Sequence, residues 1–164
     1  LSKKPDSTRG FTLIEILVVI GIIALLAAVV LVAINPARQF AQARDSQRNS
    51  NLNAILNAVG QRIADNKGIF AGTFTIGVTT YTCGPLPTGE TGITTTMAVN
   101  ITTATGDLGC LIPTYIPAFP TDPSGATAPD IGYNILVDAS GRVHVIADAT
   151  EPSIERLIDI EIVR

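Results

Sequence analysis

The fold is decided by residues 9–34, which read RGFTLIEILVVIGIIALLAAVVLVAI. The 24 residues from Phe11 to Ile34 contain one charged side chain, that of Glu15. A helix needs about 20 mostly apolar residues to cross a bilayer, and 24 residues rise about 36 Å against a hydrocarbon core of about 30 Å. The run therefore predicts a membrane-spanning helix over residues 11–34.

Glu15 is the unusual feature of this run. A carboxylate inside an apolar span costs about 2.5–3.5 kcal/mol, and less near a helix end. The run offers no Lys or Arg as a partner. A cut between Gly10 and Phe11 would create an α-amine four residues before Glu15, a spacing that shares one helix face. The same pair can form between neighbouring helices, or Glu15 can simply be solvated among the headgroups, and the residues alone leave these possibilities open.

The residues around the start of the run form a recognisable motif. Lys3, Lys4 and Arg9 precede residues 10–15, GFTLIE, and the long apolar run follows. This arrangement resembles the class III signal of bacterial type IV pilins and type II secretion pseudopilins. The resemblance is specific over about residues 1–40 and only architectural beyond them.

The resemblance implies roles for three residues. A prepilin peptidase would cut between Gly10 and Phe11 on the cytoplasmic side, and the same enzyme would N-methylate Phe11. Glu15 would match the glutamate that neutralises the N-terminal amine of a neighbouring subunit during filament assembly.

The charges that flank the run indicate its orientation and compartment. Residues 1–10 form a short basic leader, and the positive-inside rule places them in the cytoplasm and the rest of the chain outside. An ordinary secretory signal has an apolar core of about 7–15 residues followed by a small-residue cleavage site. Here the core is longer and ends in residues 33–36, AINP, so we expect the anchor to be retained. The predicted location is the bacterial inner membrane as a single-pass precursor and then, as the resemblance implies, a cell-surface or periplasmic filament.

Residues 35–67 predict an amphipathic continuation of the helix. Pro36 is expected to kink the helix or open it locally, and residues 66–68, NKG, supply a stop. With that continuation, residues 11–67 form one helix of about 57 residues. Apolar residues recur at helical spacing on one stripe, and polar residues are assigned to the opposite face. The stripe is Leu52, Ile55, Leu56, Val59 and Ile63, and the polar set is Arg44, Asp45, Gln47, Arg48, Asn51 and Arg62.

Residues 68–164 predict a β-rich globular head. Alternating apolar residues indicate strands over 131–137, 142–147 and 157–163, with a hairpin turn at 138–141. Five prolines between residues 111 and 130 argue against regular sheet there. The predicted class is α+β, with a long N-terminal helix packed on a small antiparallel sheet, which is a pilin-like architecture.

The two cysteines lie in the part expected outside the cytoplasm. An oxidising compartment favours a disulfide between Cys83 and Cys110, and two unpaired thiols are the alternative. The bond would close a loop of about 28 residues. We expect no metal site, because the single histidine, His144, is far away in the sequence and stands as an exposed strand residue. Calcium binding stays open at loop carboxylates that lack the spacing of a calcium loop, namely Asp122, Asp130 and Asp138.

Composition narrows the class of function. The net charge of −3 gives no general reason for nucleic-acid binding. Arg38, Arg44 and Arg48 could meet lipid headgroups, filament neighbours or DNA, so nucleic acid stays undecided as a partner. No catalytic constellation is present, so we expect neither an enzyme nor a cofactor.

The favoured function is a structural subunit, major or minor, of a type IV pilus or pseudopilus that polymerises through its N-terminal helix. Its expected partners are like subunits in a helical filament, prepilin peptidase, membrane lipid and the assembly machinery. The alternative is a single-pass anchored binding domain that never polymerises, and a secreted enzyme is a third hypothesis. The type of filament is not decided by these residues.

Overall fold

The computed structural model describes residues 10–95, 106–148 and 160–163. The chain divides into two compact units, residues 1–39 and residues 40–164. We call them the N-terminal unit and the C-terminal unit, and we describe each by itself. The fold class is α+β, as predicted.

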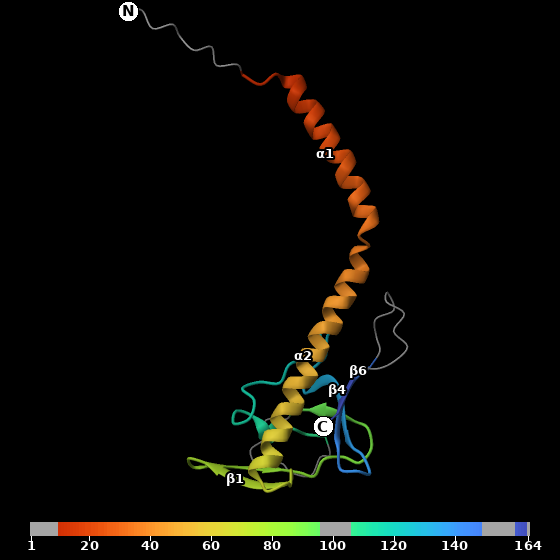
Figure 1. Cartoon of the computed structure of the whole chain (residues 1–164). Helices are drawn as coiled ribbons and strands as arrows, with labels where there is room; N and C mark the ends of the chain where they lie inside the picture. Colours follow the sequence, from red (N-terminus) through yellow and green to blue (C-terminus); the bar gives the residue numbers. More distant parts are fainter. Residues whose placement is uncertain (1–9, 96–105, 149–159, 164) are drawn as a thin grey trace, which may run out of the picture. The chain divides into compact units, whose positions relative to one another are not determined.

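Helix α1, Leu13–Ala33, is the apolar helix of the N-terminal unit (Figure 1). Its 21 residues have a mean hydropathy of 3.4, and none of them is buried within the chain. Among the described residues it is the one helix whose length and composition suit a membrane span. An apolar surface of this size is unstable in water, so it requires lipid or other protein around it.

The helical region is interrupted at Ile34 and Asn35 rather than running unbroken from residue 11 to residue 67. Helix α2, Pro36–Asp65, begins at the proline. The ring of Pro36 disfavours helical backbone at the preceding residue and suits the first position of a helix. Asn35 then caps α2, because its side-chain oxygen accepts the backbone N–H of Arg38 at 3.3 Å. The interruption therefore falls where Pro36 was expected to kink or open the helix.

The C-terminal unit contains two antiparallel sheets. Strands β3 (Thr91–Thr94), β4 (Asp130–Val137), β5 (Val143–Ala147) and β6 (Ile160–Val163) form one sheet in the order β3-β4-β5-β6 (Figure 1). Strands β1 (Gly72–Ile76) and β2 (Thr79–Cys83) form a separate hairpin. A short 3-10 helix, η1 (Gly109–Leu111), follows the described part of the loop after β3.

The core of this unit lies between α2 and the four-stranded sheet. The predicted stripe on α2 is confirmed, since four of its members are at most 1% exposed and Ile63 packs at the edge. Burial of such side chains stabilises a fold by about 1.5–3 kcal/mol each. The sheet contributes alternate residues from its strands, namely Ile93, Ile131, Tyr133, Ile135, Val143 and Val145.

Helix α2 ends at Asp65, directly before the stop predicted at residues 66–68. The residue with left-handed backbone that follows the helix is Lys67, with φ of 57°, and Gly68 comes one position later. The Gly68 N–H donates to the Ile63 carbonyl at 2.8 Å, which closes the last turn in a Schellman arrangement.

The β-region follows the predicted pattern where it is described. Strands β4 and β5 are joined by the expected turn, in which the Gly141 N–H donates to the Asp138 carbonyl at 3.0 Å. Residues 157–159 of the expected final strand lie outside the described residues, as do residues 96–105. The proline-rich segment forms turns rather than sheet.

A disulfide joins Cys83, the last residue of β2, to Cys110 in η1, with the Cα atoms 5.4 Å apart. The two residues are 27 positions apart, so the bond ties the hairpin to the segment after β3. A closed loop of this length restricts the unfolded chain, which favours folding.

We expect that replacing both cysteines by alanine lowers the free energy of unfolding by about 3–4 kcal/mol, because the unfolded chain regains the entropy of that loop. Denaturant unfolding of the purified protein, followed by tyrosine fluorescence, measures the change. Reduced wild-type protein should show a similar loss. Equal unfolding midpoints for oxidised, reduced and variant protein would contradict the prediction.

Candidate functional site

The N-terminal end of α1 holds the three residues singled out by the sequence. Gly10 and Phe11 precede the helix in non-helical backbone, and the Phe11 side chain is 85% exposed. A protease can bind and cleave a peptide bond in such a position without unwinding a helix. Thr12 is the N-cap of α1, and Glu15 lies in its first turn.

Thr12 and Glu15 form a capping box. The Glu15 Oε2 atom accepts the backbone N–H and the hydroxyl of Thr12, each at 2.8 Å, and the Glu15 N–H donates to the Thr12 hydroxyl at 3.3 Å. The negative charge also lies at the helix N-terminus, where the helix dipole favours it. The apolar helix therefore keeps its carboxylate through local bonds to Thr12.

The polar residues of α2 correct the sequence interpretation. Asp45, Arg48, Asn51 and Arg62 were assigned to the face opposite the apolar stripe, yet all four are at most 5% exposed. Helix periodicity explains the placement, since residues three, four or seven apart share a face. Asp45 and Arg48 lie seven and four positions before Leu52, so they continue the buried stripe toward the helix start.

Arg48 is the centre of a buried ionic cluster. Its guanidinium donates to Asp45 Oδ1 at 2.9 Å and to the two Asp122 carboxylate oxygens at 2.7 and 3.1 Å. It also contacts the Ser124 hydroxyl. Burial alone would raise the pKa of Asp122, but the hydrogen bonds from Arg48 and Ser124 outweigh it and lower that pKa. The cluster thus fixes the segment around Asp122 against α2.

A second polar contact extends this attachment to the sheet. The Asn51 side-chain amide donates to the Tyr133 hydroxyl at 2.8 Å and to the Thr121 carbonyl at 3.1 Å. Burial raises the pKa of Tyr133. At Gly132, where φ is +79°, an added Cβ would lie 2.9 Å from the Asp122 Cβ. Glycine therefore allows the Asp122 segment to lie directly on β4.

Arg62 is buried near the end of α2 in a different way. Its guanidinium donates to the carbonyls of Phe70 and Gly72, each at 3.2 Å, and lies 4.7 Å from the centre of the Phe74 ring. The two backbone carbonyls and the cation–π contact thus stabilise the buried positive charge of Arg62. These bonds anchor the base of the β1–β2 hairpin on α2.

His144 does not stand alone as an exposed strand residue. Its Nε2 atom lies 3.0 Å from Asp138 Oδ2, and its Nδ1 atom contacts Glu161 Oε1. Sequence reasoning missed this cluster, because the three residues come from a turn and two strands. The register of β5 with β6 was needed to place Glu161 beside His144.

The loop aspartates considered for calcium all have other partners. Asp122 bonds Arg48, Asp130 accepts the Gly132 N–H at 2.8 Å, and Asp138 bonds the turn that follows it. Across residues 10–95, 106–148 and 160–163, no three metal-ligating side chains are grouped so that they could hold an ion.

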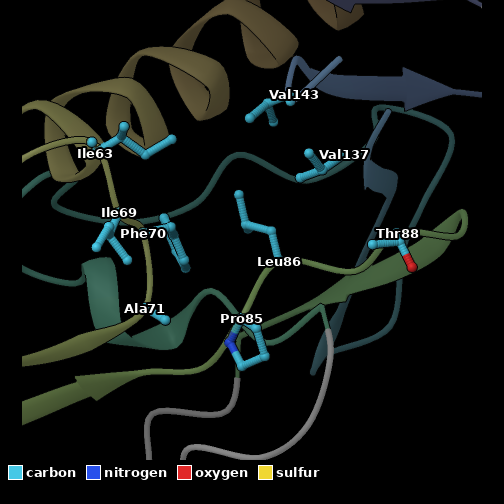
Figure 2. Close-up of a pocket in the computed structure, with 11 residues that line it drawn as sticks. Ile63, Ile69, Phe70, Ala71, Pro85, Leu86, Thr88, Val137 and Val143 are labelled. Carbon is cyan, nitrogen blue, oxygen red and sulfur yellow. The ribbon is translucent and has the colours of Figure 1, made fainter. Parts of the chain in front are cut away.

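An apolar hollow of about 320 Å³ opens on the surface of the C-terminal unit (Figure 2). Figure 2 shows Ile63 from α2, the segment from Ile69 to Ala71, Leu86, and Val137 and Val143 around it. None of its lining residues carries a charge. The hollow is suited to an apolar group, and Thr88 is the one polar side chain that lines it.

Comparison with known proteins bears on the N-terminal unit. The family model of the prokaryotic N-terminal methylation motif matches residues 6–31. This motif is the hallmark of type IV pilin and pseudopilin precursors, which prepilin peptidase processes. No curated protein and no solved structure matches the chain. The chain therefore carries a prepilin-type N-terminus, followed by a head that the comparisons do not classify.

Proposed function

We propose that this chain is a structural subunit of a type IV pilus or a related pseudopilus. The observation that carries the proposal is the methylation motif at residues 6–31, which includes most of the apolar helix α1, none of whose residues is buried. Such a helix suits lipid first and the helices of other copies afterwards. The proposed role is structural rather than enzymatic.

The geometry supports a sequence of steps. The precursor is held in the inner membrane by α1, with residues 1–10 in the cytoplasm. Prepilin peptidase cleaves between Gly10 and Phe11 and methylates the new Phe11 amine. Glu15 then accepts that amine, from its own chain or from a neighbour, as the helices of successive subunits pack together. The disulfide-bonded C-terminal unit forms the filament surface, on the cell surface or in the periplasm.

The first test is the intact mass of the protein recovered from bacterial membranes that contain a prepilin peptidase. We expect the mass of residues 11–164 plus one methyl group and less two hydrogens for the disulfide. A Gly10→Val variant should keep its leader, because the residue that the peptidase reads is altered. Gly21→Ala is the matched control, since an added Cβ at Gly21 meets nothing within 4 Å and α1 stays apolar.

Two masses would contradict the proposal. Wild-type protein that retains residues 1–10 would indicate a simple anchor. Protein that begins after Ile34 would indicate ordinary secretion.

The second candidate is an anchored binding domain that does not polymerise. The apolar hollow beside Ile63 and Phe70 favours it, because the hollow is open and uncharged. Under this function the processed protein would stay monomeric in detergent at every concentration. Filaments or concentration-dependent oligomers would exclude it.

A further inference from the structure

His144 lies between two carboxylates that belong to different parts of the C-terminal unit. Its Nε2 faces Asp138 in the turn between β4 and β5, and its Nδ1 faces Glu161 on β6. In the register of β5 and β6, His144 is opposite Val163, so Glu161 is its diagonal neighbour on the same face. The His144 side chain is 14% exposed, which keeps both contacts partly away from water.

The chemistry of imidazole decides what this geometry requires. A neutral imidazole has one N–H and one lone pair, whereas an imidazolium has two N–H groups. Both ring nitrogens face carboxylate oxygens, so only the imidazolium satisfies Asp138 and Glu161 together. Loss of the proton would set a lone pair against one of the two carboxylates.

The two carboxylates are not held equally. Asp138 accepts backbone N–H groups from Ser140 at 2.8 Å and Arg142 at 3.0 Å, and it pairs with the Arg142 guanidinium at 2.8 Å. Within the described residues, the side-chain bond of Glu161 is the one to His144. Deprotonation removes the imidazolium charge from both contacts. Asp138 is still held by its turn, whereas Glu161 keeps at most a hydrogen bond from a neutral ring.

Strand β6 is the element that depends on Glu161. It has four residues, and among the described strands it pairs with β5 alone, at the edge of the sheet. The charged groups that face His144 in the described residues are Asp138 and Arg142 from the turn and Glu161 from β6, while β4 places Leu136 opposite it. The described cation nearest this pair, Arg142, is bonded to Asp138.

We propose that protonated His144 holds the edge strand β6 against β5 through its contact with Glu161. We call this pH-dependent contact the latch. In the protonated state the latch is closed. In the neutral state β6 is held less tightly at the edge of the sheet.

The pKa directions agree with this geometry. The hydrogen bond with Glu161 and then the one with Asp138 raise the pKa of His144 above its ordinary 6.5. A raised folded-state pKa means that the stabilisation is complete below about pH 6.5 and is lost as the pH rises through the raised value. The hydrogen bonds from Arg142 and His144 lower the pKa of Asp138, so this carboxylate stays charged until strongly acidic pH.

The test uses the full chain in detergent, purified without a histidine tag. His144 is the only histidine, so the imidazole signals in an NMR titration need no assignment. Hydrogen exchange, corrected for the intrinsic effect of pH, then reports the protection of β6 and of β4 across the same range. We expect a ring pKa above 6.5 and a loss of β6 protection of about three- to tenfold through that pKa, with β4 unchanged.

A matched pair of variants separates the latch from a general charge effect. Glu161→Gln removes the carboxylate on β6, and Glu90→Gln removes an exposed carboxylate that bonds Asn134 of β4, a strand that does not pair with β6. Glu161→Gln should lower the ring pKa and abolish the pH dependence of β6 protection, and Glu90→Gln should change neither. A ring pKa at or below 6.5, β6 protection that ignores the titration, or equal effects of both variants would overturn the proposal.

Discussion

Replacing Arg48 by methionine is expected to lower the free energy of unfolding by about 3–5 kcal/mol, because it leaves buried carboxylates without their cation. The Arg48 side chain is 1% exposed, and its partners Asp45 and Asp122 are 7% and 13% exposed. Methionine fills much of the same space and neutralises neither carboxylate. Denaturant unfolding measures the loss, followed by the three tyrosines, all of which lie in the C-terminal unit.

Two further variants make this prediction specific. Arg38→Met is the same exchange at an exposed position of the same helix and should change stability by less than about 0.5 kcal/mol. The triple variant Arg48→Met, Asp45→Asn, Asp122→Asn should recover part of the loss, because it removes the unpaired charges as well. Equal stabilities of the Arg48 and Arg38 variants would show that the cluster contributes little.

The Arg48 cluster also makes the stability of the fold depend on pH in the acidic range. The lowered pKa of Asp122 means that its stabilisation is present above its ordinary value of 3.8 and is lost as the pH falls below it. In the Arg48→Met variant this part of the acid sensitivity should disappear. Unfolding midpoints measured between pH 3 and pH 6 provide the comparison.

Replacing Glu15 by leucine is expected to reduce filaments by at least tenfold while insertion and cleavage continue. Leucine removes a carboxylate whose cost is about 2.5–3.5 kcal/mol at the centre of an apolar span and smaller near its end, so the helix enters the membrane at least as readily. It also removes the acceptor for the Phe11 amine, which fixes the axial position of one helix against the next in the proposed filament. The yield of sheared filaments, with intact mass to show processing, measures both steps.

The controls for Glu15 keep either the charge or the apolar character. Glu15→Asp retains a carboxylate and should assemble better than the leucine variant. Val19→Leu is an apolar exchange in the same helix and should assemble normally. Normal filaments from Glu15→Leu would show that Glu15 has no role in assembly. The methylation motif would then support processing of the precursor but not the proposed assembly contact.

The helices show where sequence reasoning works well. The apolar span, the stripe from Leu52 to Ile63 and the turn after β4 depend on residues close together in the chain, and each was predicted near its observed place. The error on α2 came from reading charged residues as exposed. Their phase on the helix, four and seven positions before Leu52, was the available signal for Arg48 and Asp45.

The sequence by itself determined the motif of residues 10–15, the apolar span and the alternation of the strands, because these are local patterns of period and spacing. Only the tertiary structure decided which charges are buried and which carboxylates they meet. Arg48 and Asp122 are 74 positions apart, and His144 and Glu161 are 17 apart. Such pairs depend on how the proline-rich segment crosses α2 and how β6 registers with β5. Burying a charge is costly unless a partner is supplied, and the folded arrangement of distant segments supplies it.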